Sequence, residues 1–240
     1  MMVILRKHTN FYREIFKIQG IFKEPFLTLG YQEIEENIPS DFRHKDLKAL
    51  LLSKGLKSIV TCDYFDPRAD LKYDLNFPVP ISEHEKYNVV FDIGTLEHIF
   101  DTRQAIENCM RMVRVDGLYF LHTPIKGYFG HGLHVFNPKG LIDILTNNNF
   151  KILYLKFSSS SGEIVRDFND RDDILIWVIG KKIEKTGRLN IPQQRMWENE
   201  YKMIKETKPV SFFKHLIFIT LKFFWHFLVF LKYRTIKILK

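Results

Sequence analysis

The feature that most constrains this chain is the alternation of short apolar runs with amphipathic segments between residues 25 and 180. Strands that alternate with helices indicate a mostly parallel sheet covered by helices. The last two runs have no long helix between them, so we expect the final strand to be antiparallel. The pattern predicts seven strands, at 25–30, 57–63, 69–74, 87–92, 118–122, 150–157 and 174–180, with helices at about 41–54, 102–113 and 138–147.

Composition changes along the chain divide its 240 residues into four parts. This length suits one α/β domain with an appendage better than two full domains. We expect an N-terminal helical cap at 1–24 with a short amphipathic helix at 8–20. The α/β domain follows at 25–182, then a polar linker with a short helix at 183–209, and a basic hydrophobic helix at 210–240.

The C-terminal part carries much of the positive charge of a chain whose net charge is +8. Its apolar stretch approaches the ~20 residues that span a bilayer, but Lys222 and His226 interrupt the middle. Basic side chains beside an apolar face are typical of a helix lying at a lipid surface. We therefore predict a membrane-surface helix; a spanning or re-entrant segment, or a helix that packs on a protein, remains open.

The N-terminus shows one short apolar run followed by charges, without the apolar core and cleavage site of a signal peptide. Together with the basic tail, this predicts a cytoplasmic protein at the inner face of a membrane. Cys62 and Cys109 belong to no CxxC motif or Cys/His cluster, and the pair His131 and His134 has no carboxylate at ligand spacing. No metal site is predicted.

The most specific stretch runs from residue 88 to 124 and reads NVVFDIGTLEHIFDTRQAIENCMRMVRVDGLYFLHTP. It resembles the second half of class I (Rossmann-like) S-adenosylmethionine-dependent methyltransferases, in which a strand ending in Asp leads to an LEH segment, a helix, an R-V-x-x-G-G segment and a further strand. The residues that match are Asp92, Leu96, Glu97, His98, Asp101, Arg114, Val115, Asp116 and Gly117. The resemblance implies a three-layer fold with a reversed final hairpin, and S-adenosylmethionine as cofactor.

The same resemblance implies where the cofactor binds, because ligands of open α/β sheets lie at the carboxyl ends of the strands. Asp63 follows the second strand and suits the ribose hydroxyls, which are donors. Asp74 follows the third strand and suits the adenine amino group, with the Leu75 N–H facing a ring nitrogen. Asp92, Gly94 and Thr95 are expected to lie beneath the methionine part.

The loop after the first strand departs from the family pattern. Methyltransferases of this class usually have G-x-G-x-G there, because small residues let the backbone pass close to the cofactor. This chain has Leu29-Gly30-Tyr31-Gln32-Glu33 instead. Either the cofactor binds through Gly30 and polar side chains such as Gln32, or the site has decayed and the chain is an inactive scaffold or a membrane-bound interaction protein.

The loop from Thr123 to Phe136 is where this fold carries residues for the methyl acceptor. His131 lies between two glycines, and a histidine suits proton transfer near neutral pH. We predict His131 as the catalytic base, the alternative being that the histidines of this loop only hydrogen-bond it to the sheet. Tyr128 and Phe129 are expected to form a lid or to line the acceptor pocket. The acceptor is expected to be a small molecule, a sugar or a lipid-linked glycan. Nucleic acid is not expected, because Thr123-Pro124-Ile125-Lys126 stands in place of an N-P-P-Y tetrapeptide.

Overall fold

The structure is a computed structural model that describes residues 2–166, 168 and 173–192. Residues 193–209 of the expected linker and the C-terminal helix expected at 210–240 lie outside the described residues. The elements in chain order are β1 (Met2–Ile4), η1 (Arg6–His8), α1 (Thr9–Ile15), β2 (Phe26–Leu29), β3 (Gln32–Ile34), η2 (Ser40–Phe42), α2 (Leu47–Ser53), β4 (Val60–Cys62), η3 (Ile81–Glu83), β5 (Tyr87–Ile93), η4 (Leu96–His98), α3 (Thr102–Met112), β6 (Val113–Lys126), α4 (Pro138–Asn147), β7 (Phe150–Ser159) and β8 (Ile174–Lys182).

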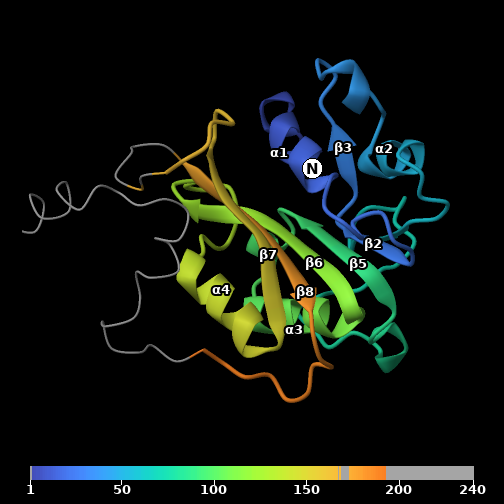
Figure 1. The fold of residues 1–240 in the computed structure, drawn as a ribbon, viewed down its shortest axis with the longest axis vertical. Coiled ribbons are helices and arrows are strands. Elements are labelled where there is room, and N and C mark those ends of the chain that lie inside the picture. The colour runs from blue at the N-terminus through green and yellow to red at the C-terminus, as the bar shows by residue number, and fades with distance from the viewer. Residues whose placement is uncertain (1, 167, 169–172, 193–240) are drawn as a thin grey trace, which may run out of the picture. The chain divides into compact units, whose positions relative to one another are not determined.

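Six strands form the central sheet, in the order β4-β2-β5-β6-β8-β7. The pairs β4–β2, β2–β5 and β5–β6 are parallel, whereas β8 runs antiparallel to both β6 and β7. The ribbon in Figure 1 shows β8 between β6 and β7. The parallel sheet with a reversed last strand is confirmed.

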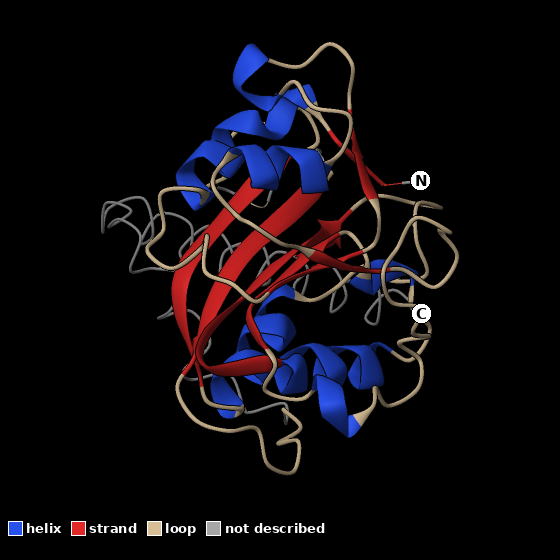
Figure 2. Cartoon of the chain, turned by 90° about the vertical axis from the view of Figure 1, so that its right-hand side faces the viewer, coloured by secondary structure: helices blue, strands red, loops and turns tan. Residues whose placement is uncertain are grey.

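The sheet is buried on both faces, as Figure 2 shows from the side. Neighbouring residues of one strand enter opposite layers: Phe91 packs with the cluster of α1 and α2, and Val90 packs with that of α3 and α4. Strands covered on both faces are read in sequence as continuous apolar runs, which is why β5 is buried along its whole length. The three-layer architecture is therefore confirmed.

The expected third strand at 69–74 is wrong, because only Leu71 pairs with β4, through an isolated parallel bridge to Cys62. The Leu71 N–H donates to the Thr61 carbonyl, and the Asp63 N–H donates to the Leu71 carbonyl. The next donor along β4, the Thr61 N–H, is taken by the Asp70 carboxylate at 2.8 Å. A side chain thus takes the place of a backbone carbonyl, and the ladder ends after one residue.

The N-terminal residues belong to the same compact unit as the sheet, which extends to Pro192. Phe11 of α1 stacks on Trp177 of β8, with ring centroids 4.9 Å apart. A second, two-stranded parallel sheet joins β1 to β3 and was not expected from the sequence. At the other end, Leu189 is buried and the Asn190 N–H donates to the Asn148 side chain.

The helix expected from about residue 41 begins later, at Leu47. Its N-cap is Asp46, whose side chain accepts from the Ala49 N–H, whereas Ser40 lies in the separate 3-10 turn η2. Among the described residues no helix combines the length and the apolar character needed to cross a bilayer.

Candidate functional site

A cavity of about 810 Å³ opens at the carboxyl ends of the parallel strands. Its walls are formed by residues that follow or end β2, β4, β5 and β6, together with the N-terminal segment. This is the place where open α/β sheets bind ligands, and the volume lies within the usual range for small-molecule sites. The lining residues used below are Tyr31, Gln32, Asp63, Phe65, Asp66, Arg68, Gly94, Glu97, His98, His122, Tyr128, His131 and His8.

Asp63 follows β4 and lines the cavity, as expected. Its Oδ2 accepts from the Tyr31 N–H at 2.9 Å, and its Oδ1 accepts from the N–H groups of Phe65 and Asp66. The carboxylate therefore ties the loop after β2 to the loop after β4. A carboxylate offers about four acceptor positions, so one remains beyond these three backbone donors.

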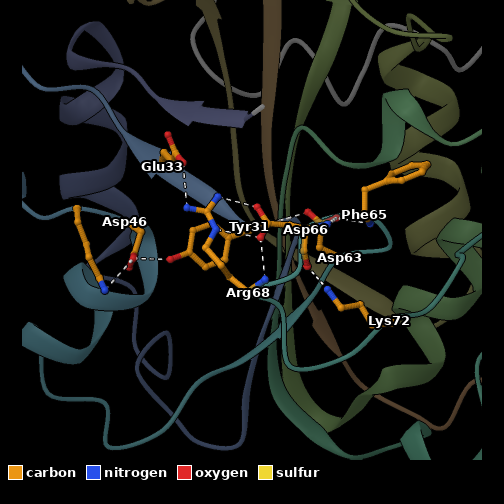
Figure 3. Close-up of polar contacts among 9 residues, drawn as sticks. Tyr31, Glu33, Asp46, Asp63, Phe65, Asp66, Arg68 and Lys72 are labelled. Atoms are coloured by element: carbon orange, nitrogen blue, oxygen red, sulfur yellow. Dashed lines mark hydrogen bonds and ion pairs between the residues drawn. The ribbon is translucent and has the colours of Figure 1, made fainter.

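Tyr31, which stands in place of a small residue, forms part of the cavity wall. Figure 3 shows its side chain between Asp46 and Arg68. Its hydroxyl donates to the Asp46 carboxylate at 2.6 Å, and that hydrogen bond is the main cause that raises the pKa of Tyr31 to about 12. The Arg68 guanidinium lies 3.8 Å from the ring centroid. Arg68 also pairs with Asp66 at 2.6 Å and with Glu33 at 3.1 Å.

Two of the predicted glycines occupy left-handed backbone. Gly30 has φ +72° and donates its N–H to the Cys62 carbonyl, which carries the chain from β2 into the loop of Tyr31. Gly94 has φ +71°, and a Cβ there would lie 3.0 Å from the Glu97 Oε1. Gln32 is buried and lines the cavity; its amide donates to the Ile93 carbonyl at 2.9 Å, bridging the ends of β2 and β5.

Five predicted cofactor residues are absent from the cavity lining: Gly30, Asp74, Leu75, Asp92 and Thr95. The Asp92 side chain is fully buried and accepts from the Thr95 N–H and the Tyr119 hydroxyl. Asp92 thus shapes the turn that presents Gly94. Asp74 accepts from the N–H and amide of Asn76, so its carboxylate closes a local turn.

Glu97 of η4 lines the cavity and is 2% exposed. Its Oε2 accepts from the Thr123 hydroxyl at 2.9 Å. Burial, and secondly the Asp92 carboxylate, raise the pKa of Glu97 to about 8. Glu97 is therefore largely protonated at neutral pH.

His131, the predicted base, lies beside Glu97, with its Nε2 4.0 Å from the Glu97 Oε1. Its ring meets those of His98 and Tyr128 edge to face, at centroid distances of 5.2 and 5.6 Å. Burial, and secondly His131, lower the pKa of His98. His134 lies apart from this group, since its Nε2 contacts the Phe100 carbonyl.

His122 of β6 and His8 of η1 form the inner wall of the cavity. The His122 ring lies 3.9 Å from that of Trp177 and 5.8 Å from that of His8. Neither His122 ring nitrogen has a hydrogen-bond partner among the described residues, and both are buried. Burial lowers the pKa of His8 to about 4 and that of His122 well below its usual range.

Sequence reasoning missed Phe65, Asp66 and Arg68, because a loop of unpatterned polar residues gives no sign of where it folds back. It also missed His8 and His122, whose proximity depends on the N-terminal segment packing across β8. The LEH segment did point to Glu97 and His98, as residues that cap the next helix or support the methionine end of the cofactor.

No protein-family model matches the chain, and no curated protein matches it. Among solved structures, it is similar to an S-adenosylmethionine-dependent methyltransferase from Mesorhizobium loti, with 10% identity, a TM-score of 0.48, and 73% of this chain and 98% of that one covered. It is also similar to a putative sarcosine dimethylglycine methyltransferase from Galdieria sulphuraria, with 10% identity and a TM-score of 0.47. That similarity covers 73% of this chain and 85% of the other. The similarity to the [4+2]-cyclase SpnF has 13% identity and a TM-score of 0.43, and covers 66% of this chain and 74% of the other.

These similarities are too low to carry an activity over to this chain. The fold itself rests on the strand order β4-β2-β5-β6-β8-β7, with β8 reversed between β6 and β7. The chain from Met2 to Pro192 therefore has the class I methyltransferase fold, one strand short of the usual seven.

Proposed function

We propose that this protein is an S-adenosylmethionine-dependent methyltransferase. The observation that carries the proposal is Asp63: its carboxylate lines a cavity at the carboxyl ends of the parallel strands and keeps one acceptor position beyond its three backbone donors. An acidic side chain at this point suits the ribose of a nucleoside cofactor.

The cavity walls fit the two halves of such a cofactor. Phe65 lines the cavity with its side chain largely exposed, and a flat apolar ring suits stacking of a purine. Gly94 lines the cavity after β5, where absence of a side chain leaves room for the amino-acid part. The proposed adenine contact thus comes from the loop after β4, and Asp74 has no support from the cavity lining.

The cofactor supplies a methyl group on a cationic sulfur. The residues of this chain hold and orient the acceptor, because methyl transfer is an in-line displacement that depends mainly on alignment. His131 is half exposed at the cavity, where it can accept a proton from an acceptor hydroxyl or amine. The neutral Glu97 beside it can donate a hydrogen bond to the acceptor instead of repelling a developing negative charge.

The acceptor class that we propose is a small molecule, a sugar or a lipid-linked glycan. Supporting this are the neutral histidines along the inner wall, which suit uncharged polar groups, and the basic apolar sequence at 210–240. Such a sequence suits an anionic lipid surface. We propose on these grounds that the enzyme works at the cytoplasmic face of a membrane.

The test is a thermal-shift titration with S-adenosylhomocysteine. Ligand at a hundred times its dissociation constant stabilises a fold by ~2.7 kcal/mol, so the wild type should show a saturable rise in Tm. Asp63→Asn should lose this rise, and the matched control Asp116→Asn should keep it, because Asp116 is an exposed partner of Lys181. No shift in the wild type at millimolar ligand would contradict the proposal.

A second candidate is a scaffold with this fold that binds no cofactor. The observation in its favour is that Tyr31 and Arg68 stack at the cavity wall, where the family usually has small residues. Under this alternative, Asp63→Asn leaves every ligand-binding property unchanged, and the side chain only ties the two loops together.

A further inference from the structure

Three metal-ligand side chains meet at the acceptor end of the cavity: Glu97, His98 and His131. Each can offer one ligand atom, and these atoms all lie within 4.8 Å of one another. Glu97 is buried, whereas the two histidines are exposed toward the cavity mouth. Two imidazoles and one carboxylate form a donor set that binds zinc in catalytic sites and leaves further coordination positions open.

The backbone around the cluster is built to place the Glu97 carboxylate. A Cβ on Gly94 would lie 3.0 Å from its Oε1, so glycine makes room for that oxygen. A Cβ on Gly132 would lie 2.9 Å from the Glu97 carbonyl, which instead accepts the N–H groups of Leu133 and His134. The loop that bears His131 is thereby fixed against η4.

The carboxylate also has the outer support that metal ligands usually have. Thr123 is fully buried, and its hydroxyl donates to the Glu97 Oε2. This hydrogen bond fixes the carboxylate and leaves Oε1 on the side of His131. Such outer contacts orient ligands and are worth roughly 10- to 100-fold in metal affinity.

The distances require a small movement for metal binding. Ligand atoms about 2.1 Å from a tetrahedral zinc ion lie ~3.4 Å apart, and the His131 Nε2 is 4.0 Å from the Glu97 Oε1. His131 is half exposed, so a change in its side-chain torsions can close this gap without moving the sheet. We propose that Glu97, His98 and His131 bind a divalent transition-metal ion of the zinc class.

This site would assign an acceptor class, an inference that rests on the proposed methyl transfer. A divalent ion with an open position binds an oxygen of the acceptor and lowers its pKa, so a hydroxyl or enol is favoured. The O–H bond breaks and its proton passes to solvent at the cavity mouth. The acceptor oxygen then forms a new C–O bond to the methyl group, and the sulfur keeps the electron pair of the broken C–S bond. His131 then serves as a ligand in place of a base, and Glu97 releases its proton to solvent when the ion binds, in place of donating to the acceptor.

The experiment is a titration of the full, untagged chain with Co²⁺, first treated with chelator and without any cofactor. One equivalent should bind and give the visible absorption of four- or five-coordinate Co²⁺, which excess Zn²⁺ removes. His131→Ala and Glu97→Gln should abolish this spectrum. The matched control His134→Ala, from the same loop but outside the cluster, should leave it unchanged.

Thr123→Val distinguishes a preorganised metal site from weak surface binding. It leaves the three ligands intact but removes the hydrogen bond that orients Glu97, so it should weaken Co²⁺ affinity about 10- to 100-fold. Absence of the absorption, or its persistence in His131→Ala with the fold confirmed by circular dichroism, would overturn the metal site. Binding of S-adenosylhomocysteine, measured separately in the presence of chelator, tests the proposed function independently. Failure of the metal site can therefore be told apart from failure of the proposed methyltransferase function.

Discussion

The Arg68 guanidinium lies 3.8 Å from the ring centroid of Tyr31, and the Tyr31 hydroxyl donates to Asp46 at the start of α2. Tyr31 stands where small residues usually follow the first strand of the fold, and Arg68 reaches it from the loop after β4. The Tyr31 side chain spans from the cavity wall to the N-cap of a helix, so the altered loop is bonded into the surrounding structure.

Removing the Tyr31 hydroxyl should therefore cost stability and leave ligand binding intact. Tyr31→Phe keeps the ring beneath Arg68 but loses the hydrogen bond to Asp46, and a hydrogen bond to a charged group is worth roughly 1.5–3 kcal/mol. Urea unfolding should show a loss in that range. The control Tyr64→Phe, at an exposed side chain, should lose nothing. An equally stable Tyr31→Phe would show that the bond is not maintained in solution.

Much of the fold could be predicted from the sequence, because buried strands are continuous apolar runs and the hairpin of β7 and β8 has no long helix within it. The third strand could not, since its termination depends on the Asp70 side chain binding the Thr61 N–H. Asp63 was found because it directly follows an apolar run. The side-chain partners of Asp92 could not be predicted, because a strand-end carboxylate can face the cavity or, as here, the turn behind it.

The pH dependence of stability should carry the signature of His8. Its pKa in the folded protein is about 4, below the ordinary 6.5, because it is buried. Between these values the unfolded chain binds a proton that the folded protein does not, so this contribution is present above pH 6.5 and is lost as the pH falls toward 4. The total is about 3 kcal/mol at ~1.4 kcal/mol per pKa unit.

The measurement is the free energy of unfolding against pH for the wild type and for His8→Gln. Subtracting the two profiles removes the opposite contributions of the buried acids Glu97 and Asp92. The difference should fall with decreasing pH across this window, and His84→Gln, at a site away from the cavity, should match the wild type. A flat difference profile would mean that the pKa of His8 is the same in the folded and the unfolded state.

Gly94→Ala should damage both the fold and the acceptor end of the cavity. Its left-handed φ of +71° strains any other residue, and the new Cβ would meet the Glu97 Oε1. We expect a loss of stability of ~1–2 kcal/mol and loss of Co²⁺ binding. Gly187→Ala is the control, since a Cβ there meets nothing within 4 Å. A Gly94→Ala protein that binds Co²⁺ as tightly as the wild type would show that the carboxylate is not held as described.

Deleting residues 210–240 should abolish binding to lipid vesicles and leave the cavity functional. The deleted sequence is apolar and basic, so the full chain should sediment with vesicles rich in anionic phosphatidylserine, and less so at high salt. The truncated chain should stay in the supernatant and bind S-adenosylhomocysteine normally. Unchanged sedimentation after truncation would refute the membrane role of this segment.

The central claim is tested most directly by a crystal structure of the protein with S-adenosylhomocysteine. We predict that the ribose hydroxyls donate to the Asp63 carboxylate, that the adenine lies against Phe65, and that the sulfur points toward Glu97 and His131. A ligand bound elsewhere, or a cavity kept closed by Tyr31 and Arg68 at saturating ligand, would contradict the account.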